Sequence, residues 1–223
     1  MSVPFRMFTV LGAILFAFIC SLKRRRGGKE ATLFLRVYLL LTLVTEVLAD
    51  YCNFHYHNNL VVYQIMGPFV LTCSSLYFNY SHPVLSKYGV GYWVAVAGFL
   101  FTIINWLWFE QVRMLNTNFA QLECCAITVL CLLYFYQYLR SDDRVISFHK
   151  DPAFWSAFLF LIFYLGTQGC WAAIELLHMR HASKSELNMV YYLVYGFAMV
   201  FYVGIGLICF AGNTLKKFNK TNT

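Results

Sequence analysis

The chain has 223 residues, of which 60% are hydrophobic and only 12% are charged, and its formal net charge is +7. Soluble domains usually carry roughly 25% charged residues, so this composition excludes an ordinary soluble domain. The positive charge is compatible with nucleic-acid binding, but the Lys and Arg residues lie in short clusters between apolar runs. Such clusters are typical of loops that flank membrane spans. We therefore expect the lipid bilayer as a partner and no nucleic acid.

Seven apolar runs are long enough to form transmembrane helices, which need about 20 mostly apolar residues each. They cover residues 4–22, 31–51, 60–78, 90–108, 119–139, 153–177 and 188–212. The joints between them are short, so we expect no soluble domain on either side. The sequence predicts an all-α transmembrane fold, a seven-helix bundle formed by a single membrane domain over residues 1–223.

The distribution of Lys and Arg predicts the orientation of the bundle. If the N-terminus lies outside, twelve basic residues fall in the inner segments and four in the outer ones. An excess of basic residues marks the cytoplasmic side. The sequence thus predicts a multi-pass protein of the cell inner membrane, with its N-terminus out and its C-terminus in. Arg36 lies close to the inner end of its span, where we expect it to reach the headgroups.

Three carboxylates lie inside the apolar runs: Glu46, Glu123 and Glu175. The predicted topology places all three in the outer half of the bilayer. A carboxylate at this depth is costly unless it is paired, protonated or lined by water, so it usually has a function. The pattern predicts a polar cavity that faces outward.

Further polar residues follow the helical repeat of the same spans. In the second span, polar residues occur at i, i+4 and i+8: Thr42, Glu46 and Asp50. This spacing would place all three on the same face of a helix. Interhelical hydrogen bonds that only fix the packing are the alternative explanation. The predicted ligand-binding residues are Glu46, Asp50, Asn59, Tyr63, Glu123, Gln168, Trp171, Glu175, Asn188 and Tyr192.

A weak internal repeat relates the two halves of the chain. At a constant offset of 129 residues, identical residues occur at 46/175, 48/177, 59/188, 61/190, 63/192 and 67/196. Two parallel three-helix units joined by a single helix would give this pattern, the 3+1+3 plan of some transporters. Coincidence among apolar helices is the alternative. If the repeat is real, Glu46 and Glu175 should face the interior at similar depth, and Gly67 and Gly196 should allow a neighbouring helix to approach closely.

Metal and catalytic motifs are weak. Glu175, His178 and His181 form E-x-x-H-x-x-H, but His181 would point away on a continuing helix and no second E-x-x-H supports the set. No nucleotide-binding loop and no hydrolase motif occurs in the sequence. We expect no metal, no cofactor and no catalytic residue, and a protein that is more plausibly a binding protein than an enzyme.

Two short segments resemble a known group of proteins. The stretch Glu46…Asn58-Asn59…Tyr63 and the run Asp151-Pro152-Ala153-Phe154-Trp155 are similar to those of small stand-alone seven-helix bacterial membrane proteins. Relatives of that group form the membrane sensor regions of some histidine kinases. The resemblance implies signal perception or a role as a partner subunit. About eleven residues follow the last predicted span, so we expect any signal to pass through another protein.

Three functions therefore follow in order of preference. The first is a sensor-like protein that binds a small molecule, or a membrane subunit of a larger complex with a membrane protein partner. The second is a small solute transporter of the 3+1+3 type, for which the repeat is the main argument. The third is an intramembrane hydrolase that uses the outer carboxylates.

Overall fold

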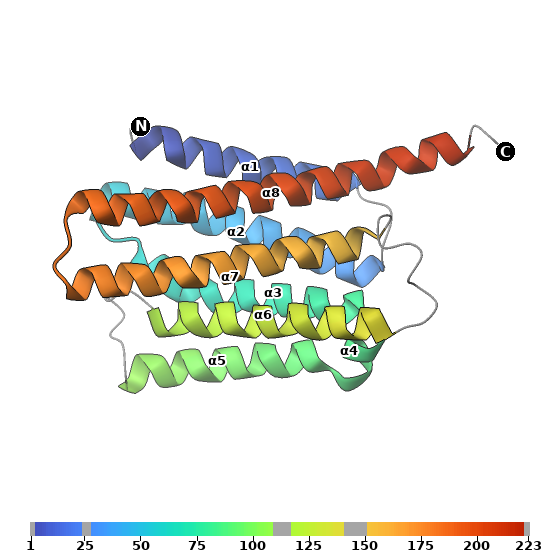
Figure 1. The fold of residues 1–223 in the computed structure, drawn as a ribbon, viewed down its shortest axis with the longest axis horizontal. Coiled ribbons are helices and arrows are strands. Elements are labelled where there is room, and N and C mark those ends of the chain that lie inside the picture. Colours follow the sequence, from blue (N-terminus) through green and yellow to red (C-terminus); the bar gives the residue numbers. More distant parts are fainter. Residues whose placement is uncertain (1–2, 24–27, 109–116, 141–150, 221–223) are drawn as a thin grey trace.

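The computed structural model describes residues 3–23, 28–108, 117–140 and 151–220, and all the regular structure in these ranges is helical (Figure 1). The helices are α1 (Val3–Lys23), α2 (Lys29–Tyr56), α3 (Leu60–Ser81), α4 (Pro83–Tyr88), α5 (Val90–Trp108), α6 (Thr117–Arg140), α7 (Pro152–Met179) and α8 (Lys184–Lys220). Seven of them are long and run side by side, whereas α4 is a short connection between α3 and α5. The predicted all-α class is confirmed.

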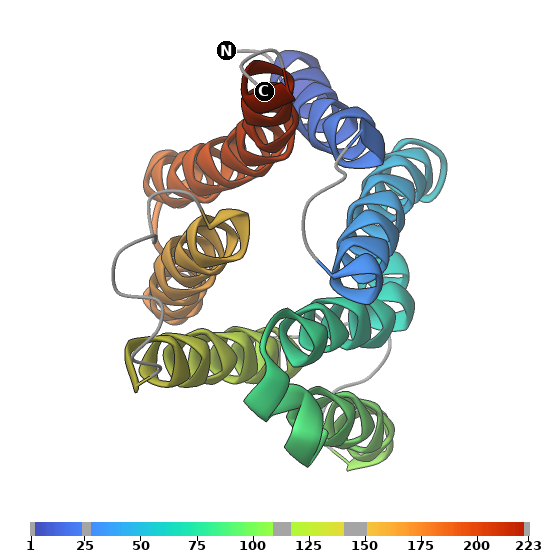
Figure 2. The ribbon, with the colours of Figure 1, turned by 90° about the vertical axis from the view of Figure 1, so that its right-hand side faces the viewer.

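Six of the long helices form a ring when the bundle is viewed end-on (Figure 2). Each helix of the ring packs against the next in the order α1, α2, α3, α6, α7 and α8, and α8 closes the ring against α1. The remaining long helix, α5, lies outside the ring against α3 and α6. The space enclosed by the ring is therefore bounded by helices from both halves of the chain.

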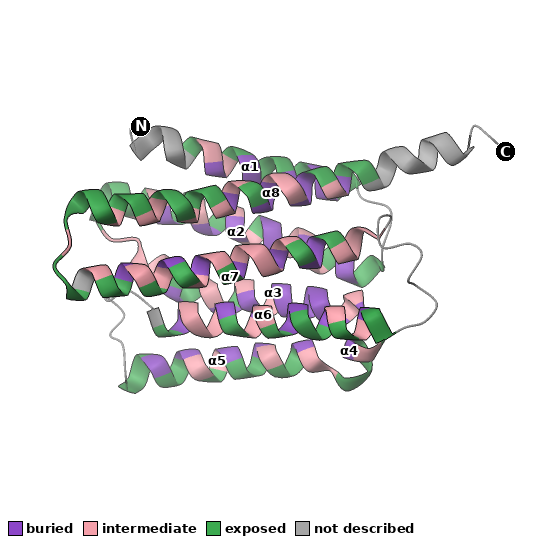
Figure 3. Ribbon diagram, in the orientation of Figure 1, coloured by how far each residue is buried: buried purple, intermediate pink, exposed green. Residues whose placement is uncertain are grey.

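The helices have the length and composition of membrane spans. Among the described residues, α2, α3, α5, α6, α7 and α8 are each long and apolar enough to cross a bilayer. The first predicted span falls on α1, whose apolar segment Phe8–Lys23 is shorter. Exposed apolar side chains cover the outside of the bundle (Figure 3), as at Leu100, Leu139, Val200 and Leu207. This surface fits lipid rather than water.

Several helix ends differ from those predicted by the apolar runs. Helix α2 continues beyond residue 51 to Tyr56, and His57 then ends it in the left-handed conformation with φ 53°. The His57 N–H donates to the Asn53 carbonyl, as expected for such a C-terminal cap. Helix α7 is likewise followed by a left-handed histidine, His181, with φ 51°. Both turns lie at the same end of the bundle.

Two helix starts follow local capping rules that hydropathy does not reveal. Ser183 and Glu186 form a capping box at the start of α8: the Ser183 hydroxyl donates to Glu186 Oε2 at 2.7 Å, and the Glu186 N–H donates back to Ser183 Oγ at 3.4 Å. At the start of α4, which was not predicted, Nδ1 of His82 accepts from the Val84 N–H at 3.3 Å. Pro83 occupies the first helical turn, where its missing N–H costs nothing.

A cluster of aromatic side chains fills the middle of the ring of helices. Phe160 of α7 is at its centre, with ring centroids 5.4 Å from Tyr38, 5.6 Å from Tyr77, 5.3 Å from Phe78 and 4.8 Å from Phe201. All five side chains are no more than 1% exposed. They come from α2, α3, α7 and α8, so this aromatic cluster joins four helices across the bundle.

Small residues allow α5 to pack tightly on α3 from outside the ring. A Cβ at Gly91 would overlap the backbone carbonyl of Ser75, and a Cβ at Gly98 would lie 2.6 Å from the Leu71 side chain. The Gly91 N–H donates to Oδ1 of the buried Asn79 at 3.1 Å. Close backbone approach and interhelical hydrogen bonds are the usual means of holding membrane helices together.

The basic residues on which the orientation depends are described only in part. The predicted inner residues Arg24, Arg25, Arg26, Arg144 and Lys150 lie outside the described residues, and so do the outer Arg113 and the side chains of Arg6, Lys216, Lys217 and Lys220. The N-out, C-in orientation stays a prediction.

Arg36 has a specific role at the end of α1. Its Nε donates to the Ser21 carbonyl at 3.0 Å and its Nη2 to the Leu22 carbonyl at 3.3 Å. These carbonyls belong to the last turn of α1 and have no partner within their own helix. A cation is also favoured at this end of the helix dipole.

Candidate functional site: a tyrosine-lined cavity

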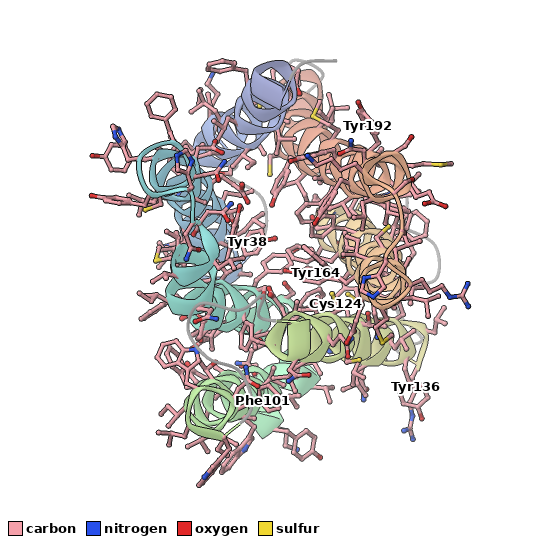
Figure 4. All side chains as sticks on the ribbon, turned by 90° about the vertical axis from the view of Figure 1, so that its left-hand side faces the viewer. Tyr38, Phe101, Cys124, Tyr136, Tyr164 and Tyr192 are labelled. Atoms are coloured by element: carbon pink, nitrogen blue, oxygen red, sulfur yellow. The ribbon has the colours of Figure 1, made fainter. Side chains whose placement is uncertain are left out.

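A cavity of about 500 Å³ lies inside the ring, in the half of the bundle where α2 meets α3 and α7 meets α8. All six ring helices contribute to its wall, whereas no residue of α5 does. Figure 4 looks into the bundle from this end, with Tyr38 and Tyr164 pointing into the space between the helices. Nine of the lining side chains are aromatic: Tyr38, Tyr63, Phe119, Phe163, Tyr164, Trp171, Tyr191, Tyr195 and Tyr202. The aromatic cluster around Phe160 forms the floor.

The cavity contains half of the predicted ligand-binding residues. Those that line it are Glu46, Asn59, Tyr63, Glu123 and Trp171. The others are not part of its wall: Asp50, Gln168, Glu175, Asn188 and Tyr192. Two of the three membrane carboxylates, Glu46 and Glu123, thus line the same cavity, whereas Glu175 does not.

Glu46 is the acidic group on the α2 side of the cavity. The Tyr63 hydroxyl of α3 donates to Glu46 Oε2 at 3.0 Å. Thr42 and Thr45 also line the cavity, but their hydroxyls donate to carbonyls of their own helix at 2.9 and 2.7 Å. Threonine commonly satisfies its hydroxyl in this way inside a helix. Glu46 is therefore the charged group that α2 contributes to the wall, and the hydrogens of the two threonine hydroxyls are already used.

Glu123 has the same kind of partner on another pair of helices. The Tyr164 hydroxyl of α7 donates to Glu123 Oε1 of α6 at 3.0 Å. Tyr164 is also a hydrogen-bonding neighbour of Tyr38, which in turn neighbours Tyr202. Tyr202 lines the cavity together with Glu46 and Glu123. The two acids thus converge on one group of buried tyrosines.

The described wall of the cavity carries two acidic side chains and no basic one. None of its described lining residues is Lys, Arg or His. Glu46 and Glu123 each accept one tyrosine hydrogen bond, and no ion pair involves either within the described part of the chain. A carboxylate has room for about four donors, so acceptor capacity remains on both.

Glu175 of α7 is not part of the cavity wall. Its side chain is exposed, and Gln121 of α6 donates to its Oε2 at 3.3 Å. Gln168, about two turns earlier, donates from Nε2 to Cys125 Sγ at 3.1 Å in the same α6–α7 contact. Of the three predicted ligand-binding residues of α7, Gln168, Trp171 and Glu175, Trp171 is the one that lines the cavity. Interhelical packing, the alternative explanation, describes Gln168 and Glu175 better.

Sequence reasoning missed the tyrosines that α8 contributes. Tyr191, Tyr195 and Tyr202 line the cavity together with Ala198. Their spacing of i, i+4, i+7 and i+11 is that of one helical face. The predicted Tyr192 follows Tyr191 directly and is therefore rotated by about 100° from it. The predicted Asn188 precedes Tyr191 by about one turn and lies near the same face, but it is not part of the cavity wall.

The residues matched by the internal repeat do not have matching surroundings. Glu46 and Tyr63 line the cavity, whereas Glu175 and Tyr192 do not. A Cβ at Gly67 would lie 2.8 Å from the Phe119 ring, whereas a Cβ at Gly196 would meet nothing within 4 Å. The close approach expected at both glycines therefore occurs at Gly67 only, and it involves a side chain rather than a helix backbone.

The members of the E-x-x-H-x-x-H motif are described only in part. Among the residues that the structure describes, no group of three or more His, Cys, Asp or Glu side chains is close enough to hold a metal ion. The side chain of His178 lies outside the described residues. His181 lies in the turn after α7, beyond the last helical residue Met179.

The long apolar helices define a polytopic helical membrane protein with an internal polar cavity. Comparisons with protein-family models, with curated proteins and with solved structures found no match to this chain. Its function is therefore argued from the cavity alone.

Proposed function

We propose that this protein is a ligand-binding membrane protein of the cell inner membrane, which perceives a small molecule through its cavity and passes the signal to a membrane protein partner. The observation that carries the proposal is the cavity itself. It has about 500 Å³, within the range of roughly 300–1,000 Å³ typical of small-molecule sites. It also combines mostly apolar walls with a few convergent polar groups, as such sites do.

The position of the cavity supports binding from one side. Its lining extends from Asn59 and Leu60, at the first residues of α3, down to Tyr38 and Tyr202. Below that level, Phe160 and its aromatic neighbours fill the ring. With the N-terminus outside, the open end faces the cell exterior. The resemblance to the membrane regions of sensor kinases agrees with such a role, and it implies a separate partner that carries the output.

A thermal unfolding screen of the full-length protein in detergent tests the proposal. Pools of cationic, neutral and anionic small molecules should include at least one that raises the unfolding midpoint of the wild-type protein. The rise should be lost in a Tyr195→Leu variant, which alters the wall, and retained in Tyr136→Phe, because Tyr136 is exposed on the outside of α6. If no pool acts, or if both variants respond alike, the cavity is not a ligand site.

A solute transporter of the 3+1+3 type is the second candidate, and the ring order favours it. Two parallel three-helix units, α1–α3 and α6–α8, would form a closed ring in the observed order with α5 as the extra helix. Alternating access requires that the cavity be reached from both sides of the membrane.

Cysteine labelling separates the two candidates. Ala120 lines the cavity on α6, and Val129 lies on the exposed surface of the same helix. A membrane-impermeant thiol reagent should label Ala120→Cys from the outside only, measured above the background of the wild-type cysteines and compared with Val129→Cys. Labelling from both sides would favour the transporter.

A further inference from the structure

We propose that the cavity binds a small organic cation, whose ammonium group is attracted by the carboxylates of Glu46 and Glu123 and whose apolar part packs against the tyrosine rings. This inference rests on the proposed ligand-binding function and names the chemical class of the ligand.

The charge of the wall is the first argument. Both carboxylates face the same cavity, and no basic side chain is present among its described lining residues. An isolated charge in an apolar region is costly, and a partner of opposite charge removes much of that cost. An anionic ligand would be repelled by both acids, and a neutral ligand would leave them uncompensated. A cationic ligand would compensate the charge of both carboxylates.

The hydrogen-bonding state of the acids is the second argument. Tyr63 occupies one oxygen of Glu46, and Tyr164 occupies one oxygen of Glu123. In the described part of the chain, the second oxygen of each carboxylate, Oε1 of Glu46 and Oε2 of Glu123, accepts no hydrogen bond from a side chain. The tyrosines hold each carboxylate in place, and each keeps an oxygen for the N–H groups of a ligand or for direct contact with a quaternary ammonium group.

The aromatic walls are the third argument. A cation within about 6 Å of an aromatic ring is attracted to the negative face of that ring, and several rings together enclose quaternary ammonium groups. Tyr63, Tyr164, Tyr195 and Tyr202 all line the cavity from three helices, with Trp171 beside them. Such a wall compensates a positive charge while presenting apolar surface to the rest of the ligand.

The size of the cavity favours an organic cation over a metal ion. Calcium and magnesium take about six to eight oxygen ligands at roughly 2–2.6 Å. The described residues contain no acidic cluster of that kind, and the cavity of about 500 Å³ is far larger than an ion. A ligand that fills it needs an apolar body in addition to its charged group.

Two pairs of probes test the charge and the apolar body. Choline is compared with 3,3-dimethylbutan-1-ol, its neutral analogue of the same shape, and benzyltrimethylammonium is compared with phenylacetate. Binding to the full-length protein in detergent is measured by equilibrium dialysis and by the shift in unfolding midpoint. We expect both cations to bind at least tenfold more tightly than the neutral and anionic probes.

Variants then assign the binding to the two acids. Glu46→Gln and Glu123→Gln should each weaken binding of benzyltrimethylammonium at least tenfold. Glu30→Gln should not change it, because Glu30 is exposed in the first turn of α2. If a Gln variant does not fold, Tyr195→Leu is used instead. This variant should weaken binding of benzyltrimethylammonium several-fold.

The outcomes separate this inference from the function on which it rests. Equal binding of choline and its neutral analogue, or cation binding that survives both Gln substitutions, would overturn the cation site. If the cations do not bind while another pool of the screen stabilises the protein, the cavity is still a ligand site and only the proposed chemical class of the ligand is wrong. If nothing binds at all, both proposals fall.

Discussion

The Tyr63 hydroxyl donates a 3.0 Å hydrogen bond to Oε2 of Glu46 and so joins α2 to α3 at the wall of the cavity. The Tyr164–Glu123 hydrogen bond, also 3.0 Å long, repeats this arrangement between α7 and α6. Each carboxylate is thereby held by a phenol from a neighbouring helix. The site is built from two such pairs. Glu46 and Tyr63 are positions of the internal repeat, whereas Glu123 and Tyr164 are not.

Removal of one phenol tests how firmly the wall is held. Tyr63→Phe keeps the ring but leaves Glu46 without its tyrosine donor. Because a hydrogen bond to a charged group contributes about 1.5–3 kcal/mol and this pair is partly exposed, we expect a loss of about 1 kcal/mol in the free energy of unfolding. Denaturation in detergent measures it, and Tyr136→Phe, on the exposed face of α6, is the control. Equal stability of both variants would contradict the structural role of the bond.

The two glycines of the repeat give a matched pair of substitutions. Gly67→Ala should move the Phe119 ring, since the added Cβ would lie 2.8 Å from it, and should lower the unfolding midpoint. Gly196→Ala meets nothing within 4 Å and should be neutral, or stabilising by up to about 1 kcal/mol, because alanine favours the helix. Equal destabilisation at both positions would show that they have equivalent surroundings after all.

The contact of α5 with α3 should be sensitive to a single methyl group. In Gly91→Ala the new Cβ would overlap the backbone carbonyl of Ser75, which cannot rotate away as a side chain can. We expect a loss of about 1–3 kcal/mol, the usual cost of overpacking. Gly12→Ala on α1 has no atom within 4 Å of the added carbon and serves as the control. Thermal unfolding that is unchanged in Gly91→Ala would mean that the two helices are farther apart.

The three membrane carboxylates should fall into two groups. Glu46→Gln and Glu123→Gln change the charge of the cavity, whereas Glu175→Gln changes an exposed group whose partner is Gln121. We therefore expect the first two variants to lose ligand binding at least tenfold and the third to keep it. Binding assays on all three check this, and a loss in Glu175→Gln alone would place the site at the α6–α7 contact around Glu175 instead of in the cavity.

The orientation can be tested by reporter fusions. Truncations fused near Asn58 and Ser183 should report an external location, and those fused after Lys29, Lys150 or at Thr223 a cytoplasmic one. The reason is the excess of basic residues in the predicted inner segments. An external report at Thr223 would reverse the bundle, and the cavity would then open to the cytoplasm.

Hydropathy predicted the helices well because a span needs a long apolar run, and this property is visible in the sequence. It placed α5 at residues 90–108, where the structure has Val90–Trp108. The ends were less accurate, since the left-handed turn at His57 and the capping box at Ser183 depend on local geometry. Short α4 was missed because Pro83 looks like a loop residue and equally suits the first turn of a helix.

The site was predicted in part for a different physical reason. Helical spacing identifies the residues that share a face, but in a membrane helix both the lipid side and the core side are apolar. Polarity alone therefore pointed to all three glutamates and gave no way to see that Glu46 and Glu123 line the cavity, whereas Glu175 is exposed and does not. On α8 the same ambiguity favoured Tyr192 over Tyr191 and Tyr195.

The central position of Phe160 has a mechanical consequence. Its ring touches Tyr38 of α2, Tyr77 and Phe78 of α3 and Phe201 of α8, and interiors packed this closely transmit displacement. A tilt of any of these helices relative to α7 would therefore displace the Phe160 side chain. We expect a change in the shape of the cavity to be transmitted through Phe160 to the helices that pack around it.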